Sequence, residues 1–541
     1  MTVLAAAGVV KSFGSRRILD ELDFEVGAQA RIGVIGANGS GKSTLLRLLA
    51  GVEEPDGGDV ARRRDLVVSY LPQHVAGDER TAPQTVLAAR PDLVRLEDEL
   101  ARVAARLGQP EVAADLNLMT RVLRQQEVLV EEFEQAGGPS VEGRSRALLR
   151  ELGLADDDLE LPTRALSGGQ RKLVALAACL VRDPDVLLLD EPETHLDTQK
   201  RSELEALVGR FDGAVVVVSH DRYLLDETVS TIAELDHGRI REWPGNYSAY
   251  QLARELELKR QQVLYVTQQK EIARLEDAVR RFRHWAHITV NERHAKQARV
   301  KQMQIDRMEK IERPVLERHR IGLALHAHAR GGDRVAELTG VSVAFGDDPV
   351  LLDVDLTVLR GERVGIVGVN GAGKSVLVKT MIGELEPTEG EVRRGASIRV
   401  GYLPQDAQLD DPDRTPVEIV RSRFPLSEGE TVSRLMKFLF DYEQVRRPAR
   451  LLSGGERTRL VFLLLMLGGA NCLVLDEPTN HLDLDSVERL EGAIEEYDGT
   501  VLVVSHDRYF LDRVADRIVA VDAGALRVFE GGYSAYAERA A

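Results

Sequence analysis

Cysteine is scarce in this 541-residue sequence, which contains only Cys179 and Cys472. Two cysteines exclude a disulfide framework and a four-cysteine zinc site, and we interpret both as small buried residues in a reducing compartment. Long apolar runs are also missing, since the longest, Leu460 to Leu467, falls far short of the roughly 20 residues that cross a bilayer. The first residues lack the basic segment of a secretory signal. These absences predict a cytoplasmic chain without membrane insertion.

The sequence also lacks an excess of positive charge. It has 71 Lys and Arg against 88 Asp and Glu, a formal net charge of -17. A protein that binds polyanions over its whole surface is therefore disfavoured, unless the basic residues are concentrated in one segment. The 43% hydrophobic and 29% charged residues are typical of a globular protein and exclude a disordered or collagen-like one. At roughly 150 residues per domain, the length predicts three or four domains.

The chain contains one domain-sized unit twice. The octet Gly-Ala-Asn-Gly-Ser-Gly-Lys-Ser at 36–43 returns as Gly-Val-Asn-Gly-Ala-Gly-Lys-Ser at 368–375, 332 positions later. Leu-Ser-Gly-Gly at 166–169 and Val-Ser-His-Asp-Arg-Tyr at 218–223 return 286 positions later. Because solenoid repeats recur every 20–50 residues or so, repetition at this scale indicates a duplicated domain.

The two offsets differ by 46 residues, which predicts an insertion in the first copy between Gln73 and Ser167. Helical composition at 95–108 and 117–136, on either side of Gly-Gln-Pro, predicts a protruding helical hairpin within an arm at about 85–150. Residues 95–136 include nine acidic and five basic residues. The arm is therefore a poor candidate for direct contact with a phosphate backbone.

Residues 251–332 belong to neither copy. The segment is rich in Gln, Arg, Lys, Glu and Ala, and has no proline before Pro314. Apolar residues spaced by three and four predict one helix face: Ile272, Leu275, Val279 and Phe282. We expect two long antiparallel helices with a tip near 284–291, the second ending at Pro314. The predicted domains are thus 1–250, a linker at 251–332, and 333–541.

Each glycine-rich octet follows an apolar strand-like run and precedes a helix-forming run, which is the context of a phosphate-binding loop rather than of a structural glycine turn. Glycines allow consecutive backbone N–H groups to surround phosphates, and the helix N-terminus adds positive potential. Lys42 and Lys374 would reach the β and γ phosphates, and the hydroxyls of Ser43 and Ser375 would bind Mg²⁺.

Paired carboxylates end two continuous apolar runs, as Asp190-Glu191 and Asp476-Glu477. Such strands are buried on both faces in parallel sheets, and active sites lie at their carboxyl ends. We expect each Asp to bind Mg²⁺ and each following Glu to act as the general base for the attacking water. His220 and His506 also end apolar runs, where each could sense or donate a hydrogen bond to the γ-phosphate.

The order of these motifs resembles the ABC ATPase superfamily, and it occurs twice. Leu-Ser-Gly-Gly-Gln at 166–170 and Leu-Ser-Gly-Gly-Glu at 452–456 resemble its signature motif. The resemblance implies that the signature of each copy completes the nucleotide site of the other, so that Lys42 faces Ser453 and Gly455, and Lys374 faces Ser167 and Gly169. It also implies that Phe13 and Phe345 stack on adenine and that Gln73 and Gln405 contact the metal.

The motifs and the resemblance together assign the following residues. Catalytic roles fall to Glu191, Glu477, His220 and His506. Metal ligands would be Ser43, Gln73, Asp190, Ser375, Gln405 and Asp476. ATP would be bound by Phe13, Gly36, Asn38, Gly39, Gly41, Lys42, Ser43, Thr44, Gln73, Ser167 and Gly169, and by Phe345, Gly368, Asn370, Gly371, Gly373, Lys374, Ser375, Gln405, Ser453 and Gly455.

Fused tandem ABC domains, a long charged linker and Asp-Glu-Pro-Thr-Asn-His-Leu-Asp at 476–483 resemble the ABC-F family over essentially the whole chain. The implied fold is α/β, with two P-loop NTPase domains of ABC type joined by a long α-helical hairpin linker. The implied function is ATP hydrolysis by a ribosome-bound translation factor or antibiotic-resistance factor, whose linker approaches P-site tRNA and the peptidyl transferase centre. Such a protein would be a monomer that closes its two ABC domains on ATP, with no role for DNA.

The linker composition agrees with an RNA partner. Residues 278–310 include nine Lys or Arg and three Asp or Glu. Phe282 and Trp285 are interspersed among the cations, and this combination suits phosphate contact and base stacking. A solvated coiled-coil face is the alternative interpretation of the same charge run. The candidate RNA-binding residues are Arg280, Arg281, Arg283, Arg293, Lys296, Arg299 and Lys301.

Two departures from the family pattern point to unequal sites. The first copy has Glu193 and Thr194 where the family has Thr-Asn, and the second has Val376 where the first has Thr44. We expect both sites to bind ATP but leave open whether they hydrolyse it equally. The motifs are also compatible with the ATPase subunit of a transporter that has a separate permease, since both use the same catalytic residues. The basic linker disfavours that alternative, and the missing zinc cysteines disfavour a DNA-repair ATPase.

Overall fold

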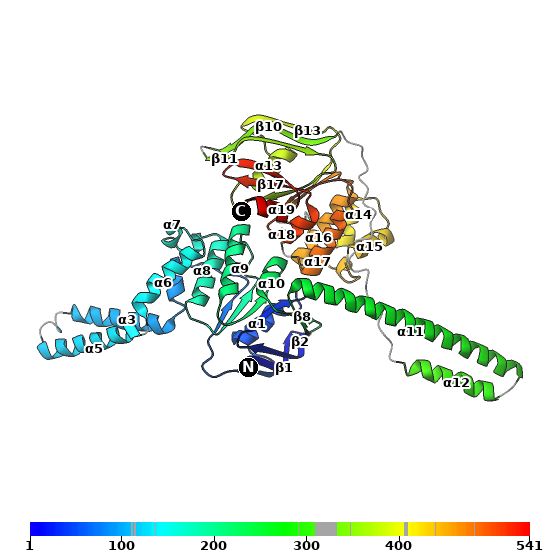
Figure 1. Cartoon of the computed structure of the whole chain (residues 1–541), viewed down its shortest axis with the longest axis horizontal. Helices are drawn as coiled ribbons and strands as arrows, with labels where there is room; N and C mark the ends of the chain where they lie inside the picture. Colours follow the sequence, from blue (N-terminus) through cyan, green and yellow to red (C-terminus); the bar gives the residue numbers. More distant parts are fainter. Residues whose placement is uncertain are drawn as a thin grey trace. The chain divides into compact units, whose positions relative to one another are not determined.

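The computed structural model describes residues 1–109, 112, 115–135, 137–289, 292–308, 333–346, 348–404, 409, 411–438, 440–480 and 482–540. The chain divides into two compact units, of which one comprises Met1–Asn246 and Ile321–Ala541, and the other Tyr247–Arg320. Figure 1 shows the elements of both. Gln405, which the sequence assigned to the metal, and Pro314, the expected end of the second linker helix, lie outside the described residues.

A six-stranded sheet forms the centre of the first copy, in the order β5-β6-β7-β3-β8-β9. All neighbouring pairs are parallel except β8 and β9. Every residue of β6 and β7 is buried, as expected for apolar strands covered on both faces. The strands are β3 (Arg31–Ile35), β5 (Val68–Leu71), β6 (Val186–Asp190), β7 (Ala214–Val218), β8 (Thr231–Asp236) and β9 (Arg239–Pro244).

An antiparallel sheet of three strands, in the order β2-β1-β4, completes this α/β layer structure. Its apolar residues share one buried cluster with α1 and the central sheet. The phosphate-binding loop therefore connects a strand of the central sheet to a helix that packs with both sheets. The elements are β1 (Thr2–Phe13), β2 (Arg16–Gly27), β4 (Gly57–Arg62) and α1 (Lys42–Ala50).

The second copy repeats both sheets, as β14-β15-β16-β12-β17-β18 and β11-β10-β13. The strands are β10 (Arg334–Phe345), β11 (Asp348–Leu359), β12 (Arg363–Val367), β13 (Glu389–Arg394), β14 (Val400–Leu403), β15 (Cys472–Asp476), β16 (Thr500–Val504), β17 (Arg517–Asp522) and β18 (Ala525–Glu530). The helices are α13 (Lys374–Ile382), α14 (Pro416–Arg423), α15 (Glu428–Lys437), α16 (Gly454–Leu467), α17 (Leu484–Glu495), α18 (Arg508–Val514) and α19 (Tyr533–Ala540). The predicted fold class, two ABC-type α/β domains with a helical linker, is confirmed.

The remaining helices of the first copy include the arm. In the arm, α3 and α5 lie side by side (Figure 1) and share a small apolar core that includes Leu96, Val103, Val122 and Leu129. The helices are α2 (Ala82–Leu87), α3 (Pro91–Leu107), α5 (Leu116–Gln135), α6 (Gly138–Glu151), α7 (Asp156–Leu159), α8 (Gly168–Leu180), α9 (Thr198–Arg210) and α10 (Arg222–Thr228).

The linker unit consists of α11 (Tyr247–Thr289) and α12 (Glu292–Asp306), which pack against each other (Figure 1). Their contact is apolar: Leu275 and Val279 of α11 share a cluster with Ile305 of α12. At the other end of the contact, Phe282 lies 6.1 Å from His294, with the rings stacked, and 5.9 Å from Trp285. No helix in the described part of the chain is long and apolar enough to cross a membrane.

Within the first unit, the two copies meet through a pair of equivalent contacts. Arg222 of α10 forms an ion pair with Glu491 of α17, and Arg508 of α18 forms one with Glu205 of α9. Each guanidinium also lies over a tyrosine ring of the other copy, with Arg222 4.3 Å from Tyr509 and Arg508 4.6 Å from the matching tyrosine. These residues are related by the 286-residue offset of the repeat, so the contact has an approximate twofold symmetry.

Candidate functional site

The phosphate-binding loop of the first copy joins β3 to α1. Gly41, which precedes the helix, has φ of 110°, and a Cβ there would lie 2.6 Å from Ile18, so the loop requires glycine at this position. Lys42 folds back over the loop, and its Nζ donates to the carbonyl oxygens of Gly36 at 2.7 Å and Ala37 at 3.1 Å. Lys374 makes the same contacts with Gly368 and Val369, at 2.8 and 3.0 Å. Both ammonium groups therefore lie against the backbone of their own glycine-rich loops.

A hydroxyl and a carboxylate meet at the end of each loop. Ser43 Oγ donates to Asp190 Oδ1 at 3.2 Å, and Ser375 Oγ donates to Asp476 Oδ2 at 3.2 Å. Burial raises the pKa of both Asp carboxyls. The described residues contain no group of three or more His, Cys, Asp or Glu that could hold a metal. Two oxygen donors fit Mg²⁺, because this ion usually takes one or two protein ligands together with waters and substrate phosphates.

The two proposed bases have an unusual backbone conformation. Glu191 and Glu477 have φ of 46° and 49°, and non-glycine residues rarely adopt such values outside strained or functional positions. Each backbone N–H donates at 2.8 Å to the last residue of the neighbouring strand, Val218 or Val504. The same contact thus places both residues at the strand ends, and burial raises the pKa of the Glu477 carboxyl to about 7.

The two strand-end histidines differ in their surroundings. His220 Nε2 lies 3.7 Å from Glu191 Oε1, and within the described structure neither ring nitrogen has a hydrogen-bond partner. His506 Nε2 lies 3.3 Å from Lys374 Nζ and 3.1 Å from Asn370 Oδ1. Burial lowers the pKa of His220 to about 4 and that of His506 to about 3, so both rings are neutral at pH 7.

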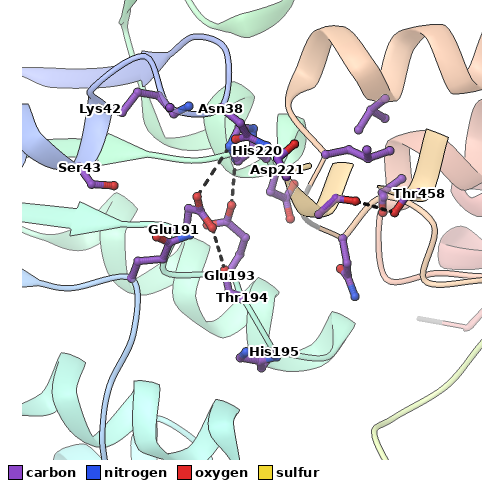
Figure 2. Close-up of a pocket in the computed structure, with 18 of the residues that line it drawn as sticks. Asn38, Lys42, Ser43, Glu191, Glu193, Thr194, His195, His220, Asp221 and Thr458 are labelled. Atoms are coloured by element: carbon purple, nitrogen blue, oxygen red, sulfur yellow. Dashed lines mark hydrogen bonds and ion pairs between the residues drawn. The ribbon is translucent and has the colours of Figure 1, made fainter. Parts of the chain in front are cut away.

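One large cavity, of about 950 Å³, joins residues of both copies. Figure 2 shows its lining, with Lys42, Ser43, Glu191 and His220 turned toward a common space and Thr458 of the second copy across from them. The predicted residues that line it are Phe13, Asn38, Gly39, Gly41, Lys42, Ser43, Thr44, Gln73, Glu191, His220 and Ser453. The structure therefore brings the first phosphate-binding loop and the second signature motif to one site.

Contacts between the copies also surround the second phosphate-binding loop. Asn370 Nδ2 donates to the carbonyl of His195 at 3.3 Å, and Thr198 Oγ1 lies 3.3 Å from Nδ1 of His506. Ser167 begins α8 through a capping box with Gln170, as Ser453 begins α16 with Glu456. Gly169 has no room for a side chain, because a Cβ would lie 2.6 Å from the His195 carbonyl oxygen. Phe345 is 55% exposed, at the end of its strand like Phe13.

Sequence reasoning missed two groups beside the first site, the buried Lys172 and the half-buried Tyr70. Lys172 Nζ donates to the carbonyl oxygens of Pro72, Gln73 and Asp190, at 3.1, 2.8 and 3.1 Å, and thus ties the Gln73 segment to the end of β6. Tyr70 donates to Asp190 Oδ2 at 3.2 Å. Tyr70 could have been found, because it belongs to the Tyr-Leu-Pro-Gln motif that occurs in both copies. Lys172 could not be found in this way, because Thr458 occupies its position in the second copy.

Comparison with known proteins assigns the family. A family model described as ABC transporter matches residues 19–194 and 351–480, and a second model with the same description matches 233–322. The putative ATP-binding protein YdiF of Bacillus subtilis is 36% identical over 541 residues, covering 100% of this chain and 83% of the relative. The ABC transporter F family member 5 of Arabidopsis thaliana is 33% identical, over 98% of this chain and 76% of its own length. The chain belongs to the ABC-F family.

This ABC-F protein is an ATPase, and its two ABC domains bind ATP. The energy-dependent translational throttle protein EttA of Escherichia coli is 33% identical over 97% of this chain and 93% of the relative. Among solved structures, the RNase-L Inhibitor aligns with a TM-score of 0.62 at 20% identity, covering 97% of this chain and 90% of that one. This likeness shows that the two share the tandem ABC fold.

Proposed function

We propose that this ABC-F protein is a ribosome-associated ATPase that acts on translation. EttA, which its name describes as a translational throttle protein, supports this proposal because the similarity extends through both ABC domains and the linker. The cationic linker hairpin is the observation that carries it. The ATPase subunit of a transporter, our alternative, uses the same catalytic residues but has no need of such a hairpin.

The linker surface has the chemistry that RNA recognition requires. Six of the seven candidate cations are exposed and Lys301 is half-buried. The indole of Trp285 is 47% exposed beside the stacked rings of Phe282 and His294. Cations neutralise backbone phosphates and exposed aromatic rings stack on unpaired bases. We propose rRNA and P-site tRNA near the peptidyl transferase centre as the contacts, in the role of a translation factor or of a factor that protects ribosomes from antibiotics.

The catalytic proposal follows from the site geometry. Bound ATP would stack on Phe13 or Phe345 and place its phosphates beside Lys42 or Lys374. Glu191 and Glu477 would take the proton of the attacking water, and His220 and His506 would contact the γ-phosphate. Mg²⁺, held by the Ser-Asp pairs, would supply charge neutralisation at the phosphates. ATP bound between the copies would close them within one cytoplasmic monomer.

Charge reversal at the linker tip tests the RNA proposal. The variant Arg293→Glu/Lys296→Glu/Arg299→Glu/Lys301→Glu turns attraction for phosphates into repulsion but leaves both ATP sites intact. We expect ATPase activity in the absence of ribosomes to stay within about twofold, while ribosome binding in a sedimentation assay is lost. Binding of the unmodified protein should weaken steeply with added salt, because phosphate neutralisation releases counterions.

A matched control uses four exposed cations on the shaft of α11. Lys259, Arg260, Lys270 and Arg274 are exposed, and their reversal to Glu changes the net charge by the same amount. This control should lose much less ribosome binding than the tip variant. Equal loss in both would mean that net charge, and not the tip, governs association. Unchanged binding of the tip variant would make the linker a spacer and favour the transporter alternative.

A further inference from the structure

Glu193 distinguishes the first ATP site from the second. It is three residues beyond Asp190, at the position where the second copy has Thr479. Its side chain lines the cavity of the first site, yet the residue is only 6% exposed. A carboxyl in such a place needs hydrogen-bond donors, because burial of an unpaired polar group is costly.

The donors come from Ser219 and His220, which directly follow β7 and are called the switch segment here because His220 is the candidate sensor of the γ-phosphate. Ser219 Oγ donates to Glu193 Oε1 at 2.7 Å, and the backbone N–H of His220 donates to the same oxygen at 2.9 Å. The other oxygen, Oε2, has no hydrogen-bond partner among the described residues. Figure 2 shows Glu193 beside Glu191, with a dashed line from each to His220. The carboxyl therefore joins the loop after β6 to the end of β7.

The second copy makes this connection with a different residue. There the backbone N–H of His506 donates to Oε2 of Glu477 at 3.4 Å. The proposed base itself thus binds the switch segment in the second site. Among the described residues, Glu191 of the first site has no such contact: its Oε1 lies 3.7 Å from His220 Nε2, and its Oε2 lies 3.4 Å from the Thr194 hydroxyl. The loop after β6 also contacts the second copy, but there the His195 carbonyl accepts from Asn370 and the Glu193 side chain takes no part.

We propose that Glu193 is a positioning residue of the first ATP site. Its carboxylate accepts a hydrogen bond from the backbone N–H of His220 and thereby holds the switch segment, so that this N–H does not bind the Glu191 carboxylate. The inference rests on the proposed role of Glu191 as the base. A base whose oxygens are not engaged by a backbone donor keeps them available to contact and orient the attacking water.

The test isolates the first site by the change Glu477→Gln and measures one turnover of radiolabelled ATP. In this background Glu193→Thr, which installs the residue of the second copy, should lower the single-turnover rate constant about tenfold. The ATP concentration that gives the half-maximal rate should change less than twofold, because phosphate contacts are kept. Glu193→Gln retains an acceptor oxygen and should stay within about threefold of the parent.

Glu203→Thr is a matched control, since this glutamate of α9 does not line the cavity and accepts from Gln199 at 3.2 Å. It should leave the rate constant unchanged. An undiminished rate in Glu193→Thr would overturn the inference, as would a Glu193→Gln variant as slow as the Thr variant. Melting temperature checks that each variant is folded. If Glu191→Gln/Glu477→Gln hydrolyses ATP at the parental rate, the base assignment fails instead, and the two failures are thereby distinguished.

Discussion

The buried ion pair between Arg222 and Glu491 should be the strongest single polar contact between the two copies. Both side chains are fully buried. The change Arg222→Met keeps much of the side-chain volume but leaves Glu491 with Arg513, at 3.1 Å, as its remaining partner. The guanidinium contact with the Tyr509 ring is lost as well.

The expected loss in the free energy of unfolding follows from the burial of both side chains. Removal of one member of a buried pair costs about 3–5 kcal/mol, because the remaining charge is left poorly compensated. Loss of the cation–π contact adds about 1 kcal/mol, and the remaining Arg513 contact offsets part of the total. We therefore expect Arg222→Met to lower the free energy of unfolding by about 3–4 kcal/mol. The equivalent pair is less buried, at 9% and 12% exposed, so Arg508→Met should cost about 2 kcal/mol.

Urea unfolding followed by tryptophan fluorescence measures these changes. The chain has two tryptophans, and Trp285→Phe leaves Trp243, a buried residue of β9, as the reporter. The double variant Arg222→Met/Glu491→Met should lose less stability than Arg222→Met alone, because no uncompensated charge remains. A loss under 1 kcal/mol for Arg222→Met, or a double variant that loses the sum of the single changes, would refute this reasoning.

Three further predictions concern the ATP sites. Glu191→Gln/Glu477→Gln should bind ATP with parental affinity but lower steady-state turnover by orders of magnitude, and retained turnover would show that the assigned bases are wrong. Burial lowers the pKa of His220 to about 4 and that of His506 to about 3, below the ordinary 6.5. The nucleotide-free protein should therefore lose stability as pH falls below about 6.5, by up to about 1.4 kcal/mol per pH unit for each ring. Replacement of both histidines by Gln should flatten this pH dependence of the unfolding free energy. Lys172→Met should raise KM for ATP more than it lowers kcat, because three carbonyls that position the Gln73 segment lose their donor, and an unchanged KM would contradict that role.

Much of the fold could be predicted because the chain repeats its motifs. Two copies of the glycine-rich octet, each between a strand and a helix, predicted two α/β domains, and helical spacing predicted the linker contact of Leu275 and Val279. Lys172, which is present in one copy alone, carried no such signal, and Glu193 was recognisable only as a departure from the family pattern. The contacts of Lys172 and Glu193 join segments that are distant in sequence, and their geometry depends on how β6 and β7 end.

The contact between the copies could have been recognised but was missed. Arg222 and Arg508 lie inside a repeated motif, and Glu205 and Glu491 share its 286-residue offset. A repeat aligned residue by residue would therefore have revealed two matched charge pairs. It would not have shown that each pair crosses between the copies, because a salt bridge within one copy fits the same spacing.

Association with ribosomes is the central claim of the functional account, and one sedimentation measurement tests it most directly. The variant Glu191→Gln/Glu477→Gln, held closed by ATP that it cannot hydrolyse, is centrifuged through sucrose with purified ribosomes. The account predicts that it co-migrates with ribosomes when ATP is present and remains at the top of the gradient when ATP or ribosomes are omitted. A variant that binds ATP yet stays at the top in the presence of both would contradict it.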